Sequence, residues 1–129
     1  MEEKKISVLA IDDDAVQLKL YKNVLHPKFD LFTVNSASNA IYFLNSNEVN
    51  VILLDISMPN ITGFDFLNDI RKVPSYYKVP IIVVSSKTGD DFINEAKKST
   101  AFDVLSKPVE PDALIAAIEK AASSDQEIP

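Results

Sequence analysis

The chain has 129 residues, of which 47% are hydrophobic and 25% are charged, and it contains no cysteine. This length fits one domain with a substantial core, and the lack of cysteine excludes disulfides and thiolate metal sites. The net charge of −6 argues against nucleic-acid binding, which needs a basic face, and no apolar run approaches the roughly 20 residues that span a bilayer.

Short apolar segments alternate along the chain with segments of helical periodicity. Near-continuous apolar strands, as opposed to strands with alternating polarity, indicate a sheet that helices cover on both faces. Five strand–helix repeats of about 22 residues therefore predict an α/β domain with a small doubly wound parallel sheet. In chain order, we expect strands at residues 6–11, 31–34, 51–54, 81–84 and 104–105, and helices at 15–25, 40–44, 64–70, 92–96 and 114–121.

The chain shows no internal linker, so we expect one domain over residues 1–122. Residues 123–129 lack apolar periodicity, and we expect them to form a flexible C-terminal tail. Pro74 and Pro80 bracket a segment that we expect to be a loop, because proline ends a helix at the preceding residue. The first residues lack the apolar segment of a signal peptide, which favours a cytoplasmic protein.

Polar side chains follow the predicted strands at the points where these strands end. The carboxyl ends of parallel strands meet at one edge of an open sheet, where ligands bind. Carboxylates for a hard cation, one carboxylate left to react, a hydroxyl and a fixed ammonium together suit phosphoryl chemistry. These residues are Asp12, Asp13 and Asp14 after the first strand, Asp55 after the third, Ser85 and Ser86 after the fourth, and Lys107 after the fifth.

Four segments carry a resemblance to a known family. They are Leu9-Ala10-Ile11-Asp12-Asp13-Asp14, Leu53-Leu54-Asp55-Ile56-Ser57-Met58-Pro59 with Gly63, Ile82-Val83-Val84-Ser85-Ser86, and Lys107-Pro108. With them, the chain resembles the receiver domain of two-component response regulators, the group that includes the chemotaxis-type single-domain regulators. The resemblance extends over nearly the whole chain and implies a flavodoxin-like (β/α)5 fold with strand order 2-1-3-4-5.

The resemblance implies a role for each matching acid and for the lysine. Asp55 is similar to the phosphoacceptor that takes a phosphoryl group from a phosphohistidine on a sensor kinase or phosphotransfer protein. Asp13 resembles the direct Mg²⁺ ligand, with Asp12 assisting largely through water and the Ser57 carbonyl completing the protein's share beside Asp55. Lys107 resembles the lysine that pairs with the phosphoacceptor and then with a phosphoryl oxygen.

The resemblance also concerns the residues that convert phosphorylation into a signal. Ser85 matches the hydroxyl that moves onto the phosphoryl group, and the Lys107–Pro108 peptide is expected to be cis. Val104 occupies a position where many receivers carry Tyr or Phe, so the coupling to the far face is expected to differ. Ser57 and Ser86, as small polar neighbours of the phosphoacceptor, are expected to tune how fast water reaches the acyl phosphate.

The expected output is contact with a downstream protein, not turnover of a substrate. Phe92, Ile93 and Ala96, with the adjoining last helix, indicate a partner surface made by the fourth helix, the fifth strand and the fifth helix. The first helix, residues 15–25, is the expected docking site for the kinase. Neither nucleic acid nor a membrane is expected as a partner of this domain.

Two alternatives stay open from the sequence. The first is a phosphatase of the haloacid-dehalogenase type, because Asp12-Asp13-Asp14 matches its Asp-x-Asp nucleophile motif, with Ser85 and Lys107 mimicking later motifs. Against it, no acidic pair ends a strand after Lys107, and Asp55 has no role in such an enzyme. The second alternative is a receiver-like interaction module that acts without phosphorylation.

Overall fold

The computed structural model describes residues 5–58, 64–87 and 89–124. Within these residues, strands and α-helices alternate as predicted, and one short 3₁₀ helix, η1, precedes the fourth strand. The strands are β1 (Ser7–Ile11), β2 (Asp30–Val34), β3 (Val51–Leu54), β4 (Ile81–Ser85) and β5 (Asp103–Ser106). The helices are α1 (Ala15–Leu25), α2 (Ala37–Ser46), α3 (Asp65–Arg71), η1 (Pro74–Tyr76), α4 (Asp90–Lys98) and α5 (Pro111–Ser123).

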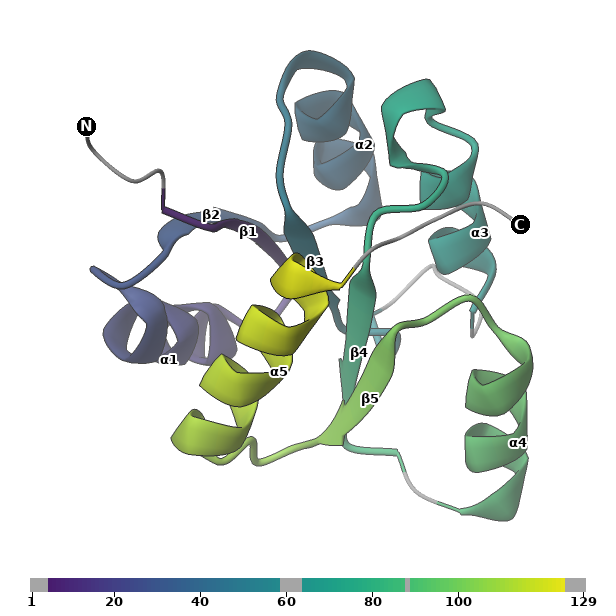
Figure 1. Cartoon of the computed structure of the whole chain (residues 1–129). Helices are drawn as coiled ribbons and strands as arrows, with labels where there is room; N and C mark the ends of the chain where they lie inside the picture. The colour runs from purple at the N-terminus through teal and green to yellow at the C-terminus, as the bar shows by residue number, and fades with distance from the viewer. Residues whose placement is uncertain (1–4, 59–63, 88, 125–129) are drawn as a thin grey trace.

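The strands form one parallel sheet in the order β2-β1-β3-β4-β5. Figure 1 shows α1 and α5 on one face of this sheet and α2, α3 and α4 on the other. The chain crosses from one half of the sheet to the other between β2 and β3, so β1 and β3 are neighbours at the switch point. Both the predicted fold class and the predicted strand order are confirmed.

Successive residues of the central strands pack into two different cores. On β3, Ile52 and Leu54 belong to the apolar cluster under α2, α3 and α4, whereas Val51 and Leu53 belong to the cluster under α1 and α5. Strands β1, β3 and β4 are therefore almost entirely buried, and the edge strands β2 and β5 are partly exposed. Burial on both faces is the reason that the central strands consist of unbroken apolar runs.

Helix starts follow directly from local sequence. Asp14 is the N-cap of α1, and its Oδ1 accepts a hydrogen bond of 2.9 Å from the Val16 backbone N–H. The hydroxyl of Ser36 caps α2 by accepting from the Asn39 N–H, and Pro111 lies at the first position of α5. Such caps satisfy backbone donors that the helix itself leaves without a partner.

The structure extends several predicted elements and changes one loop. The segment between Pro74 and Pro80 includes the helix η1, and Tyr76 is buried there with its hydroxyl donating to the carbonyl of Asn47.

Helix α5 includes Ser123, the first residue of the expected flexible tail, and residues 125–129 lie outside the described residues. Elements were predicted too short because their polar end residues carry no apolar periodicity. In the described part of the chain, no helix has the length and apolar character needed to cross a membrane.

Candidate functional site

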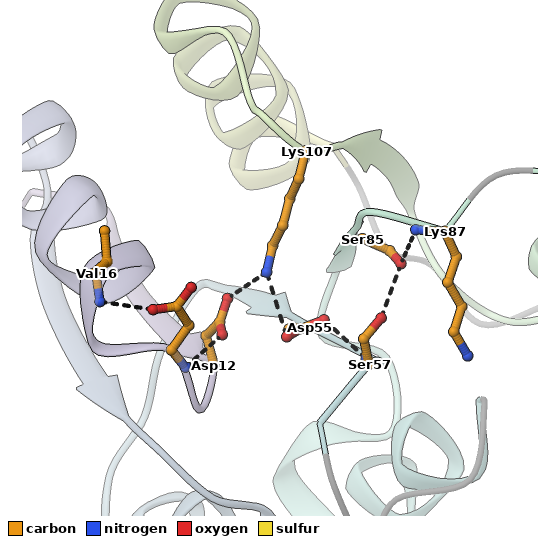
Figure 2. A network of polar contacts seen from close by, with 8 residues as sticks. Asp12, Val16, Asp55, Ser57, Ser85, Lys87 and Lys107 are labelled. Atoms are coloured by element: carbon orange, nitrogen blue, oxygen red, sulfur yellow. Dashed lines mark hydrogen bonds and ion pairs between the residues drawn. The ribbon is translucent and has the colours of Figure 1, made fainter.

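The polar residues predicted at the strand ends converge at one edge of the sheet (Figure 2). Asp12 directly follows β1, Asp55 directly follows β3, Ser85 ends β4 and Lys107 directly follows β5. The first three are buried, with exposed fractions of 0%, 4% and 1%. A cluster of buried polar side chains is costly unless its members are hydrogen-bonded or paired, so their contacts decide what the site can do.

Three of these side chains are fixed by the same local device. Each accepts a hydrogen bond from the backbone N–H two residues further along, which turns the chain out of the strand and orients the side chain. The pairs are Asp14 N–H to Asp12 Oδ1 at 2.9 Å, Ser57 N–H to Asp55 Oδ1 at 2.9 Å, and Lys87 N–H to Ser85 Oγ at 3.0 Å. The residue type at position 87 does not predict this role of the Lys87 backbone, although a serine at a strand end, such as Ser85, is a signal for such a turn.

Lys107 joins the two buried carboxylates. Its Nζ lies 2.9 Å from Asp12 Oδ2 and 3.4 Å from Asp55 Oδ2, so its shorter contact is to Asp12 and not to the expected partner. The Lys107–Pro108 peptide is cis, as expected. The backbone N–H of Lys107 donates to the Ser85 carbonyl at 2.9 Å, which ties the ends of β4 and β5 together.

Burial and charge act in opposite directions on this group of residues. Burial raises the pKa of Asp12 above the ordinary 3.8, and it outweighs the opposing hydrogen bonds from the Asp14 N–H and from Lys107. Burial alone lowers the pKa of Lys107, but the hydrogen bond to Asp12 and the charges of Asp12 and Asp55 raise it more strongly. The ammonium therefore stays charged and is held beside the carboxylates.

Three carboxylates at this edge suit a divalent cation. Asp12, Asp13 and Asp55 each offer an oxygen atom, and these atoms lie within 4.8 Å of one another. Carboxylate oxygens are the ligands that Mg²⁺ prefers, and Asp13 is exposed, which leaves the cluster open to solvent on one side. The donor set therefore fits a hard cation, while Asp14 serves as the helix cap described above.

The residues expected to tune the site occupy three different environments. The hydroxyl of Ser57 lies 3.3 Å from the hydroxyl of Ser85, a contact that the sequence did not predict. Ser86 is exposed, and Val104 is partly buried against the cluster under α2, α3 and α4. The Ser57–Ser85 contact depends on the pairing of β3 with β4, so no local sequence signal could have found it.

The expected partner surface on α4 differs in detail from its prediction. Phe92 and Ala96 are partly buried and pack against the core, so only part of each side chain remains at the surface. Ile93 is 46% exposed and remains on the outer side of α4. On α1, Val16 and Leu20 are exposed apolar residues close to the acidic end of the sheet.

Comparisons with a family model, with known sequences and with solved structures point to the same family. The family model for the response regulator receiver domain matches residues 8–119. The two-component response regulator ORR3 of Oryza sativa subsp. indica is 32% identical over 111 residues, covering 84% of this chain and 85% of that protein. The structure of chemotaxis protein CheY4 from Vibrio cholerae matches with a TM-score of 0.84 and 25% identity, over 91% of this chain and 98% of that one.

Some relatives are much longer proteins. The hydrogenase transcriptional regulatory protein HoxA of Cupriavidus necator is 31% identical over 125 residues, which are 96% of this chain but 26% of HoxA. Likewise, this chain matches 14% of the 3',5'-cyclic-nucleotide phosphodiesterase regA of Dictyostelium discoideum. The similarity to these relatives therefore concerns one part of each.

Proposed function

Because the chain belongs to the response regulator receiver domain family, we propose that it is a phosphorylatable switch of a two-component relay. In this proposal, Asp55 accepts a phosphoryl group from a phosphohistidine on a sensor kinase or phosphotransfer protein in the cytoplasm. The observation that carries the proposal is the position of Asp55, buried at a strand end, 3.4 Å from the Lys107 ammonium and in one cluster with the carboxylates of Asp12 and Asp13. The chain acts as a signalling module, with phosphoryl transfer to itself as its chemistry.

Magnesium is the expected cofactor, as is usual in this family. The carboxylates of Asp12, Asp13 and Asp55 and the carbonyl of Ser57 would hold it. Asp13 is exposed and suited to direct coordination, whereas both oxygens of Asp12 already accept hydrogen bonds, which suits assistance through water. When bound, the cation supplies positive charge that offsets the repulsion between the carboxylate and the incoming phosphoryl group.

The chain's own residues prepare the transfer. An oxygen of Asp55 forms a bond to phosphorus while the bond from phosphorus to the imidazole nitrogen of the donor breaks. The donor nitrogen keeps the electron pair of that bond, and the ring leaves as neutral imidazole because its other nitrogen carries a proton. Lys107, whose ammonium lies 3.4 Å from Asp55 Oδ2, can then pair with a phosphoryl oxygen on Asp55. The hydrogen bond from the Ser57 N–H to Asp55 Oδ1 fixes the orientation of the Asp55 side chain.

The acyl phosphate adds charge and acceptor oxygens beside Ser85. Ser85 donates its hydroxyl proton to one of these oxygens, and its displacement favours a second packing arrangement. The output surface is the face made by α4, β5 and α5, where Ile93 is exposed, and the kinase docks on α1. Val104, in the place of a larger aromatic, makes the coupling to this face specific to this chain, and Ser57 and Ser86 tune hydrolysis.

Intact-protein mass spectrometry tests the proposal. The protein is incubated with Mg²⁺ and acetyl phosphate beside Asp55→Asn and beside a sample with EDTA. One added phosphoryl group on the unaltered protein alone is the expected result. No adduct, together with no response to beryllofluoride, would reject the switch in favour of an interaction module without phosphorylation.

The same experiment separates the phosphatase alternative. An adduct that persists in Asp55→Asn and disappears in Asp12→Asn would make Asp12 the nucleophile. We expect the opposite, because Asp12 has an exposed fraction of 0% and each of its oxygens already accepts a hydrogen bond. Asp55 Oδ1 also accepts a hydrogen bond, from the Ser57 N–H, but the contact of Asp55 Oδ2 with Lys107 is longer, at 3.4 Å, and Asp55 is 4% exposed, which makes Oδ2 the better candidate for attack.

A further inference from the structure

The two hydroxyls at the ends of β3 and β4 lie against each other. Ser57 Oγ and Ser85 Oγ are 3.3 Å apart, and Figure 2 shows this contact beside Asp55. Ser85 is 1% exposed, whereas Ser57 is exposed at the rim of the site. The pair therefore joins a buried hydroxyl, which depends on protein partners, to an exposed one, which has access to water.

The bonding capacity of Ser85 is limited. A serine hydroxyl has one proton to donate and two lone pairs that accept. One lone pair of Ser85 Oγ already accepts from the Lys87 N–H at 3.0 Å, and the Ser85 carbonyl accepts from the Lys107 N–H at 2.9 Å. Ser85 is thus fixed from two sides. The Ser57 hydroxyl is its side-chain partner, and it can donate to the second lone pair of Ser85 Oγ or accept the Ser85 proton.

The contact with Ser57 competes with the contact required by the proposed function. A phosphoryl group on Asp55 carries only acceptor oxygens, so it requires the single proton of Ser85. To donate this proton, Ser85 moves its hydroxyl toward the phosphoryl oxygen, so the 3.3 Å contact with Ser57 is lost whichever of the two hydroxyls donates in it. An interaction present in one state and lost in the other shifts the equilibrium between them.

We infer that Ser57 is a positioning residue that holds the Ser85 hydroxyl in its resting place and sets how readily the switch changes state. The inference rests on the proposed function. It gives the Ser57 side chain a role separate from its backbone, whose N–H fixes Asp55 and whose carbonyl is an expected cation ligand. A change of the Ser57 side chain therefore alters the hydroxyl pair and leaves the backbone contacts in place.

Val104 makes this contact more important in the present chain. The valine pairs in register with Val83 and is partly buried against the core. A valine is too short and too stiff at χ1 to swing between two positions as a large ring can. Among the described residues around Ser85, the bond to Ser57 is therefore the side-chain contact that distinguishes its resting position.

Beryllofluoride binding in the presence of Mg²⁺ tests the inference, because this probe mimics the phosphoryl group on Asp55. We expect Ser57→Ala to bind it about two- to fivefold more tightly than the unaltered protein, because the 3.3 Å contact is longer than an ordinary hydroxyl hydrogen bond and contributes at the low end of the usual range. Ser57→Thr, which keeps a hydroxyl, should restore the original affinity. Fluorine NMR of the bound probe measures the dissociation constants.

A double-mutant cycle separates positioning from a structural effect. In the Ser85→Ala background, Ser57→Ala should change the affinity by less than about twofold, because the proposed partner is already absent. Two results would overturn the inference and leave the proposed function intact. The first is that Ser57→Ala binds beryllofluoride as tightly as the unaltered protein, or more weakly. The second is that its gain in affinity persists in the Ser85→Ala background. An unaltered protein that neither binds beryllofluoride nor gains a phosphoryl group would overturn the proposed function and the inference with it.

Discussion

Lys107 is the residue on which the charge balance of the site depends. It is the cation within ion-pair distance of Asp12 and Asp55, at 2.9 and 3.4 Å, and its side chain is 18% exposed. Asp12 is fully buried, and burial raises its pKa because the charged form loses hydration. The ammonium offsets part of this cost, so the contacts of Lys107 with the two carboxylates stabilise the folded protein.

Lys107→Ala should lower the free energy of unfolding by about 2 kcal/mol in the absence of Mg²⁺. Removing one partner of a fully buried ion pair lowers the stability by more than this value. Because Lys107 is partly exposed, water can solvate the remaining carboxylates and reduce the loss of stability. Added Mg²⁺ should recover part of it by supplying charge to the same carboxylates. Urea denaturation with and without Mg²⁺ measures both effects.

The surface pair Lys28–Glu119 provides the control for this variant. Its atoms are 3.4 Å apart, but both side chains are about half exposed, so Lys28→Ala should cost less than about 1 kcal/mol. Equal losses for Lys28→Ala and Lys107→Ala would mean that the buried contacts contribute nothing special.

The contribution of Lys107 should also depend on pH. Its pKa is raised above the ordinary 10.5, so the folded state binds a proton more tightly than the unfolded state does. The stabilisation is then complete below pH 10.5 and is lost as pH rises through the raised value. The difference between the unaltered protein and Lys107→Ala should shrink over that range in denaturation curves, and a constant difference would contradict this assignment.

Helix α4 differs from the other helices of the described structure in having no fully buried residue. None of its residues between Asp90 and Lys98 is fully buried. It contacts the core through the partly buried Phe92 and Ala96, and the Phe92 ring stacks on Phe64 at 5.9 Å. Elements with few buried contacts open more readily than the core, which suits a helix on the proposed output surface.

Phe92→Ala should increase the exchange of α4 amide protons with solvent much more than that of the central strands. The global loss of stability should be only about 1–2 kcal/mol, because Phe92 is half-buried and replacing a fully buried phenylalanine by alanine costs more. Ile93→Ala, on the exposed side of the same helix, is the control and should leave the exchange nearly unchanged. Hydrogen exchange followed by NMR separates these results, and uniform acceleration across the sheet would contradict local attachment.

The whole molecule contains two apolar cores on opposite faces of one sheet. Leu44 on α2 belongs to one of them, and Ile118 on α5 belongs to the other. Both are buried, with exposed fractions of 3% and 0%. Substitutions that share no packing partners contribute independently to stability.

Leu44→Ala should cost about 2–5 kcal/mol and Ile118→Val about 0.5–1.5 kcal/mol. In the double variant, these losses should add within about 0.5 kcal/mol, because the sheet separates the two cavities. Equilibrium denaturation of the unaltered protein, the two single variants and the double variant measures whether the two losses of stability add. A coupling well above that limit would show that the sheet transmits repacking from one core to the other.

Local chemistry explains how much of the site the sequence could predict. Asp12, Asp55, Ser85 and Lys107 stand at strand ends, and parallel strands place their carboxyl ends together, so convergence followed from the apolar runs alone. The observed bounds of α1 agree with the predicted range of residues 15–25, and Asp14 caps the start of this helix. Phe92 and Ala96 were expected on a partner surface, but they pack partly against the core. Periodicity identifies the apolar side of a helix, and it does not tell whether the core or a partner covers that side.

The sequence by itself determined the fold class, the order of the elements and the chemical types at the active edge, since these depend on hydrophobic periodicity and on residue types at strand ends. Only the tertiary structure decided which groups touch. The closer contact of Lys107 to Asp12 and the contact of Ser57 with Ser85 join residues 95 and 28 positions apart. Such distances depend on strand register and side-chain packing, which arise from the whole sheet and from no local segment of the chain.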